Sequence, residues 1–335
     1  MFNQSYAFGM ILIAIIAYFI REWRILQIYI SLPAFILILH MLAIPESPRW
    51  LYYSKHKARA WMMVKDFVSP EQKQMIAERR MSVTIRKEKK LTRIQELKKN
   101  LGYLKNKEMS LRLILNWTIW FSTSMSYYAL LITASLLKID SYLYTGLSGI
   151  AEGLSYIIVI PLLNMIGRRG TSFSLLLCAS GAFTILLIVP SHLKMITMFT
   201  ALFGKLCVSS VYVAVIIHCS ELFPTVMRNI AIGTSSTWAH IGSTIAPYLV
   251  DYFVIYGWWV PNSICGFTVF VSALLTQVLP ETKDLTLYNT MDEFISRCKA
   301  NPNEQLSLKH NIVFTILKKL QIVKKPTPET TSQEE

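Results

Sequence analysis

Eight apolar blocks, each about 20 residues long, follow one another along this 335-residue chain. A helix of that length crosses the roughly 30 Å of hydrocarbon in a bilayer. A soluble helix has one apolar stripe, whereas Leu175–Val189 carries no charged residue on any face. The pattern therefore predicts an all-α polytopic membrane protein with about eight transmembrane helices, and it argues against a large soluble α-bundle. The blocks lie at about 4–20, 25–43, 112–135, 143–164, 171–190, 195–218, 230–250 and 258–279.

Basic residues are concentrated in one segment between apolar blocks. The chain has a formal net charge of +14, and residues 44–109 hold 17 of its 34 Lys and Arg residues against 7 Asp and Glu. Cytoplasmic loops carry such an excess in multi-pass proteins, so we expect this segment and both termini to be cytoplasmic. The partner of this charge is then the lipid bilayer surface and not nucleic acid. We expect a multi-pass protein of the plasma membrane.

Several function classes lack their sequence signatures. The five cysteines form no CxxC pair, and the six histidines are scattered, so we expect no metal site and no disulfide framework. No GxSxG, HExxH, P-loop or dinucleotide fingerprint is present, so we expect no cofactor and no enzymatic activity. A channel would show a re-entrant filter or rings of like charge, and neither is visible in the sequence.

Four short charged sequences stand at the ends of apolar blocks. Pro45–Leu51 reads PESPRWL, and its two prolines end the preceding helix. Gly167–Arg169 occupies a tight turn, for which glycine is suited. Glu221–Asn229 reads ELFPTVMRN, and Pro280–Lys283 reads PETK with Asp284 next in the chain.

In this order and spacing, the four sequences resemble signatures of the organic cation, organic anion and carnitine transporters (solute carrier 22 type) of the major facilitator superfamily. Asp284 departs from the family, which usually has glycine there. The resemblance implies a carrier that moves a small organic ion across the membrane by alternating access. It aligns the eight blocks with helices five to twelve of twelve, so we expect a truncated chain without the first four helices. The alternative is a non-transporting membrane fragment or a regulatory binding protein derived from such a carrier.

The resemblance also implies a domain organisation and an inner gate. Residues 1–43 would be the last two helices of the N-terminal bundle, 44–109 the inter-bundle loop, 110–282 the C-terminal six-helix bundle, and 283–335 a cytoplasmic tail. In the family, charges of the signatures form a network that holds the inner gate closed. The matching residues in this chain are Glu46, Arg49, Arg168, Arg169, Glu221, Arg228 and Glu281.

Ionisable residues at membrane depth are functional candidates, and His240 is one of them. It shares a polar stripe with serines and threonines at three- and four-residue steps, and such a stripe faces a cavity or another helix. The family has Asp or Arg at the matching place, in cation or anion and carnitine carriers respectively. Histidine can be neutral or positive near pH 7, so the resemblance implies a position that reads substrate charge. A hydrogen bond to a neighbouring helix is the structural alternative.

Lys205 and Glu152 are the other two charges at membrane depth, and each matches a family position. Lys205 needs a carboxylate or a substrate anion unless it reaches the membrane surface. Glu152 can bind a cation, carry a proton or pair with Lys205, and internal pairing is the simplest interpretation.

Aromatic residues complete the candidate substrate site. Trp120 and Tyr127 lie on one stripe with Thr123, and Tyr212 shares a helix face with Lys205. Aromatic rings hold organic cations by cation–π attraction and flat anions by stacking. Ordinary helix packing is the alternative.

Overall fold

The structure is a computed structural model of the chain, and it describes residues 2–43, 62, 102–103, 106–136, 140–190, 193–257, 259–288, 291–301 and 305–306. The chain divides into two compact units, residues 1–19 with 97–335 and residues 20–96. In the second unit, helix α2 runs over Trp23–Ala43 and contains Pro33. The other helices named below belong to the first unit.

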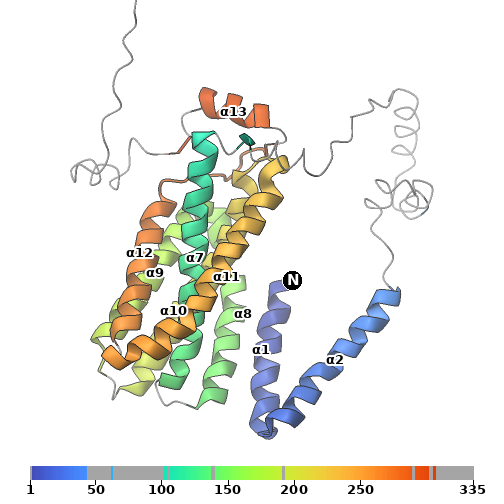
Figure 1. Cartoon of the computed structure of the whole chain (residues 1–335), viewed down its shortest axis with the longest axis vertical. Coiled ribbons are helices and arrows are strands. Elements are labelled where there is room, and N and C mark those ends of the chain that lie inside the picture. Colours follow the sequence, from blue (N-terminus) through green and yellow to red (C-terminus); the bar gives the residue numbers. More distant parts are fainter. Residues whose placement is uncertain are drawn as a thin grey trace, which may run out of the picture. The chain divides into compact units, whose positions relative to one another are not determined.

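Every predicted apolar block forms a helix, and the part of the chain that the structure describes contains no strand. The all-α prediction is thereby confirmed. Figure 1 shows the helices of the first unit side by side, apart from α13, which lies across their ends. Their bounds are α1 Phe2–Phe19, α7 Lys107–Leu136, α8 Ser141–Ile166, α9 Arg168–Ile188, α10 Lys194–Leu222, α11 Thr225–Phe253, the 3₁₀ turn η1 Val254–Tyr256, α12 Trp259–Thr276 and α13 Met291–Ala300.

The sequence sets several of these helix ends. Asp140 caps α8, since its side chain accepts hydrogen bonds from the backbone N–H groups of Tyr142 and Leu143. Gly167 separates α8 from α9 with a φ of +88°, a conformation that favours glycine. Pro224 precedes α11, where a missing N–H group leaves no helical hydrogen bond unmade.

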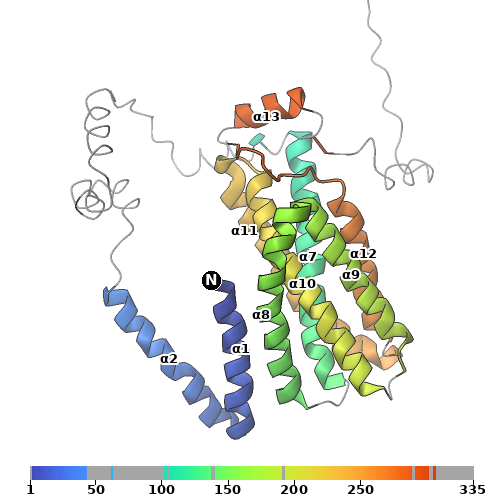
Figure 2. The same cartoon turned by 180° about the vertical axis from the view of Figure 1, so that it is seen from behind.

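Helix α7 lies at the centre of the bundle and packs against α10, α11 and α12, while α9 packs against α10 and α12 (Figure 2). Small residues allow close approach, as in other membrane bundles. A Cβ atom on Gly242 of α11 would lie 2.4 Å from the carbonyl oxygen of Phe121 on α7. Helix α1 packs along α8, and a Cβ atom on Gly149 would lie 2.8 Å from the Ile11 side chain.

Four helices of the described part are long and apolar enough to cross a membrane by length and composition: α8, α9, α10 and α12. Helices α7 and α11 are more polar because polar side chains join them to each other. Asn116 donates to the Ser235 hydroxyl at 2.7 Å, and the Trp117 indole donates to Thr234 at 3.0 Å. Such bonds between helices replace those that water would make.

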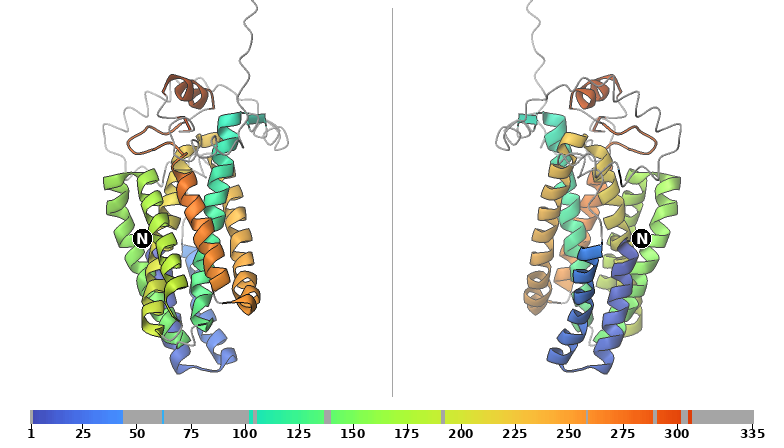
Figure 3. Two further views of the ribbon diagram at one scale, coloured as in Figure 1. Left: turned by 90° about the vertical axis from the view of Figure 1, so that its left-hand side faces the viewer. Right: turned by 90° about the vertical axis from the view of Figure 1, so that its right-hand side faces the viewer.

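Residues 277–288 and 291–301, which we call the C-terminal strap, cross one end of the bundle after α12. The Thr225 N–H at the start of α11 donates to the Tyr288 carbonyl at 3.0 Å. Helix α13 then places Phe294 under the fully buried Arg112 of α7, with 4.8 Å from the guanidinium carbon to the ring centroid. Figure 3 shows α13 lying across the helix ends. The strap therefore ties together helices that are far apart in sequence.

The grouping of α1 differs from the domain organisation expected from the sequence. Its contacts place it with α7–α13, through α8, whereas the sequence analysis groups it with α2 in residues 1–43. The contact between α1 and α8 does not test to which bundle α1 belongs. The assignment of α1 to an N-terminal bundle therefore stays a prediction.

Candidate functional site

A buried carboxylate on α8 gathers hydroxyl groups from three helices. Glu152 is 4% exposed. Its Oε2 accepts hydrogen bonds from the Tyr127 hydroxyl of α7 at 2.9 Å and from the Ser209 hydroxyl of α10 at 3.0 Å. Its Oε1 accepts one from Tyr156, one helical turn away, at 2.7 Å. These donors stabilise the carboxylate in its buried position.

Lys205 of α10 lies beside this carboxylate and is fully buried. Its Nζ is 4.0 Å from Oε2 of Glu152 and donates to the Ser148 hydroxyl of α8. The same Nζ lies 4.8 Å from the centroid of the Tyr127 ring, a cation–π distance. The structure therefore places Lys205 in an internal pair with Glu152, away from the membrane surface.

The partners of this pair follow a helical spacing that the sequence analysis overlooked. Ser148, Glu152 and Tyr156 stand four residues apart on α8, as do Lys205 and Ser209 on α10. Residues four apart share a helix face, so hydroxyl groups at these steps from a buried charge were a signal in the sequence.

The predicted aromatic residues form a wall next to the buried pair. Tyr212 makes edge contacts with Trp120 at 6.1 Å and with Tyr127 at 6.2 Å between ring centroids. Trp120 and Tyr212, with Thr123 and Val215, line a gap that is too small to hold a water molecule. The indole Nε1 of Trp120 is buried without a hydrogen-bond partner among the described residues. A buried donor of this kind is uncommon in a folded protein.

His240 lies apart from the aromatic wall. Its side chain is exposed on α11, and no hydrogen bond or ion pair among the described residues joins it to Lys205 or Glu152. Its backbone carbonyl accepts hydrogen bonds from Ser243 and Thr244, each at 2.8 Å. Those hydroxyl groups are thus engaged by the backbone of their own helix. The predicted polar stripe exists on α11, and its role in reading charge stays a prediction.

The predicted charges at the ends of α9 and α10 come together in one cluster. Arg168 donates through Nε and Nη2 to Glu221, with a closest distance of 3.0 Å. Glu281 accepts the backbone N–H groups of Arg168 at 2.8 Å and Arg169 at 3.0 Å. The Thr282 hydroxyl donates to Glu221 at 2.5 Å. The start of α9 is thereby anchored to the C-terminal strap.

Glu281 explains why glycine stands at the preceding turn. A Cβ atom on Gly167 would lie 2.7 Å from the Glu281 carboxyl carbon, so this close approach excludes a side chain. Burial opposes ionisation of Glu281, but hydrogen bonds from the backbone N–H groups of Arg168, Lys283 and Thr282 outweigh it and lower the pKa of the carboxyl. Asp284, which departs from the family glycine, has a φ of 62°, a conformation that aspartate tolerates better than most residues.

Other members of the predicted gate network are less engaged or lie elsewhere. Arg169 reaches the Leu279 carbonyl at 3.5 Å. Two guanidinium nitrogens of Arg228, Nε and Nη2, are buried without a hydrogen-bond partner in the described ranges. Glu46 and Arg49 lie outside the described residues.

Arg112 lies at the same end of the bundle and was not among the residues predicted from the sequence. Its guanidinium donates to the last carbonyl of α10, at Leu222, at 3.3 Å and to Glu108 at 3.2 Å. Glu108 also accepts the Leu306 backbone N–H at 2.8 Å. Arginine at the start of an apolar block, four residues after a glutamate, was the available signal.

Comparisons with known proteins show which family the chain is similar to. The family described as "Sugar (and other) transporter" matches residues 1–294. Solute carrier family 22 member 16 of Xenopus laevis is 28% identical over 296 residues, which cover 87% of this chain and 51% of the relative. Human organic anion transporter 3 is 29% identical over 296 residues, covering 87% and 54%. Human organic cation/carnitine transporter 2 is 27% identical over 302 residues, covering 87% and 52%.

The chain spans about half the length of the curated relatives it matches. The family match extends over most of the chain and includes the cluster of Arg168, Glu221 and Glu281. The apolar helices fit a multi-pass membrane protein. The chain belongs to the sugar (and other) transporter family of the major facilitator superfamily, and its relatives are carriers of solute carrier family 22 type.

Proposed function

We propose that this chain takes part in moving small organic ions across the plasma membrane by alternating access, with both termini in the cytoplasm. The names of its relatives support an organic-ion substrate. The observation that carries the proposal is the buried Lys205–Glu152 pair beside an aromatic wall. A charged pair without solvent is costly to build inside a membrane protein, and such groups mark substrate and ion pathways.

The Lys205–Glu152 pair contains one charge of each sign and has no net charge, so we propose that it can bind either an anion or a cation. An anionic group can replace Glu152 as the partner of Lys205, and a cationic group can replace Lys205 as the partner of Glu152. The unpartnered Nε1–H of Trp120 favours the first case, since it can donate only to an acceptor such as a carboxylate. We therefore favour organic anions or zwitterions that carry a carboxylate and an aromatic or aliphatic body. Tyr212 supplies the apolar contact in this proposal.

His240 is proposed to respond to the charge of the substrate. Its exposed side chain stands on the helix that packs against α7, the helix of Trp120. A protonated imidazole attracts an anion more strongly than a neutral one. We expect His240→Arg to raise the preference for anions and His240→Asp to lower it.

The cluster of Arg168, Glu221 and Glu281 is proposed as part of the inner gate. Its side chains are only partly buried, with 22% of Arg168 and 17% of Glu221 exposed. Separated charges at this position can be solvated, so the pair can break and reform in a transport cycle more easily than a fully buried pair. Rocking of one bundle against another would make and break such contacts.

Uptake into proteoliposomes tests the proposal. The purified 335-residue chain is reconstituted, and saturable uptake is measured for benzoate, benzyltrimethylammonium and a carboxylate betaine. We expect uptake of benzoate or the betaine, and its loss in Lys205→Ala. Lys194→Ala, an exposed lysine at the start of the same helix, is the matched control and should keep uptake. Uptake of none of the three probes by the unmodified chain refutes independent transport.

The second candidate function is binding without transport. The chain resembles carriers and spans about half of their length. The second candidate is therefore a membrane protein that binds an organic ion and regulates a partner. Equilibrium binding of the same probes separates the two functions. Binding that depends on Lys205 without uptake favours the second.

A further inference from the structure

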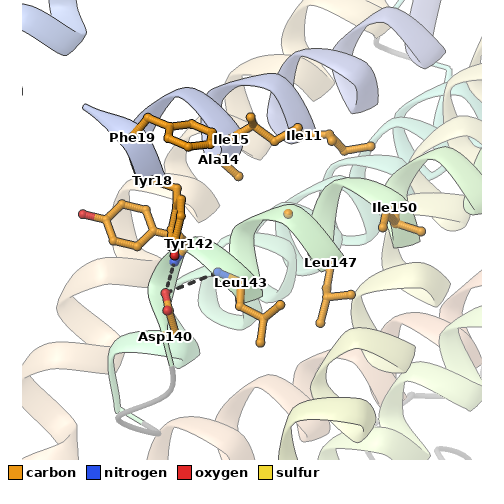
Figure 4. A pocket seen from close by; sticks show the side chains of 11 residues that line it. Ile11, Ala14, Ile15, Tyr18, Phe19, Asp140, Tyr142, Leu143, Leu147 and Ile150 are labelled. Atoms are coloured by element: carbon orange, nitrogen blue, oxygen red, sulfur yellow. Dashed lines mark hydrogen bonds between the residues drawn. The ribbon is translucent and has the colours of Figure 1, made fainter. Parts of the chain in front are cut away.

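An apolar groove lies between α1 and α8, away from the buried pair. Its volume is about 490 Å³, within the range of small-molecule sites. Side chains from two helices line it: Ile11, Ala14, Ile15, Tyr18 and Phe19 from α1, and Tyr142, Leu143, Gly146, Leu147 and Ile150 from α8, with Asp140 just before α8. Figure 4 shows the two rows of side chains along the helices.

The groove is polar at one end only. Asp140 stands at the N-terminus of α8, where the aromatic side chains of Tyr18, Phe19 and Tyr142 gather (Figure 4). Tyr18 and Tyr142 make an edge contact at 6.2 Å between centroids. Aromatic residues favour the boundary between hydrocarbon and headgroups, so this end lies at headgroup level. The other end, at Ile150, is aliphatic.

The length of the groove matches one leaflet of a bilayer. Ten residues separate Asp140 from Ile150, which corresponds to about 15 Å along a helix. Half of the roughly 30 Å hydrocarbon core is about 15 Å. Leu143 and Ile150 are each about half exposed, so the groove opens away from the protein interior. An extended acyl chain fits this length, whereas a compact soluble ion needs no apolar trough of that extent.

Asp140 decides which headgroup suits the groove. Its Oδ1 accepts the backbone N–H groups of Tyr142 and Leu143, and the carboxylate remains exposed. An exposed carboxylate attracts an ammonium group, and the faces of neighbouring tyrosines add cation–π attraction. It repels a headgroup with a net negative charge and no cation.

We propose that the groove between α1 and α8 binds a membrane phospholipid with an amine headgroup, choline or ethanolamine. The acyl chain lies along the aliphatic walls toward Ile150, and the ammonium group meets Asp140 at the helix end. The site is separate from the Lys205–Glu152 pair and does not depend on transport.

Native mass spectrometry of the full chain tests this site. The protein is delipidated and offered equal amounts of phosphatidylcholine and phosphatidylglycerol with identical acyl chains, and the lipid retained after activation is measured. We expect one retained lipid per chain, with phosphatidylcholine favoured about fivefold, the equivalent of roughly 1 kcal/mol for an exposed ionic contact. Equal retention of the two lipids overturns the proposal.

Two pairs of variants locate the binding. Asp140→Asn keeps an acceptor for the helix cap and should remove the headgroup preference, whereas Asp251→Asn, an exposed acid near the end of α11, should keep it. Leu143→Trp should fill the groove and reduce retention of both lipids. Ile157→Trp, on an exposed position of the same helix outside the groove, should not. Loss in both members of a pair, or in neither, refutes a defined site. Failure of uptake in the transport assay leaves this result unchanged.

Discussion

Breaking the buried ion pair is expected to destabilise the protein far more than breaking a surface pair. Lys205→Met leaves Glu152 without its cation in a site that is 4% exposed. Removal of one partner of a buried pair costs about 3–5 kcal/mol. Glu152 keeps three hydroxyl donors after the change, so we expect the low end of this range, about 3 kcal/mol.

The reverse change, at Glu152, leaves Lys205 without its partner. In Glu152→Gln, the Lys205 ammonium keeps the Ser148 hydroxyl and the face of the Tyr127 ring, a contact worth up to about 2 kcal/mol when desolvated. We expect a loss of about 2–3 kcal/mol. The double variant contains no unpaired charge, so its loss should be smaller than the sum of the single losses by about 2 kcal/mol or more.

Unfolding by increasing mole fraction of sodium dodecyl sulfate, followed by far-UV circular dichroism, gives the four free energies of unfolding. The partly exposed pair of Arg297 and Glu293 on α13, four residues apart with 3.6 Å between the charged groups, supplies a control cycle with an expected coupling of about 0.5 kcal/mol or less. Additivity of Lys205→Met and Glu152→Gln within about 0.5 kcal/mol would mean that the two groups do not stabilise each other. The interpretation of a closed internal pair would then be wrong.

Three further changes probe the packing and the inner end. Gly167→Ala should destabilise the protein by about 1–3 kcal/mol in the same assay, because alanine is strained at a φ of +88° and its Cβ meets Glu281. The control is Gly181→Ala, which has open space around it in a helix and should be neutral or stabilise by about 0.5–1 kcal/mol. Gly242→Ala should cost a few kcal/mol because its Cβ meets the backbone of Phe121, and a loss no larger than that of Gly181→Ala would contradict the close packing of α7 and α11. Folding lowers the pKa of Glu281, so its contribution to the free energy of unfolding is present above its usual pKa of 4.5 and is lost as pH falls through the lower folded value. Free energies of unfolding measured between pH 6 and 3 should show this loss. Glu281→Gln should flatten that part of the pH profile.

The sequence predicted the helices well because a helix that crosses the membrane must be apolar over about 20 residues. Each block became a helix, and charges from three of the four signatures lie together at one end of the bundle. Arg168, Glu221 and Glu281 came together because each stands at a helix end, where position along the chain determines position in space. That prediction did not require knowing how each helix is rotated about its own axis.

The interior of the bundle was harder to predict because depth does not determine the direction in which a side chain points. Lys205 was equally able to reach the surface or to pair with Glu152, and the choice depended on how α8 and α10 rotate about their axes. His240 lies on a polar stripe as predicted, yet its side chain is exposed and does not join Lys205. The strap contact between Arg112 and Phe294 joins residues 182 positions apart, and no local pattern in the sequence announces it.

The two charged clusters differ in the free energy needed to open them, and this difference assigns them different parts in a transport cycle. The pair of Arg168 and Glu221 is partly exposed on both side chains, so solvent can reach the separated charges, and opening it costs less than opening a fully buried pair. Opening the pair of Lys205 and Glu152 without a replacement partner costs more. In the proposed function, a substrate ion supplies that replacement, because its charge takes the place of one partner. We therefore expect the inner cluster to follow bundle motion, and the buried pair to open only when an ion is bound.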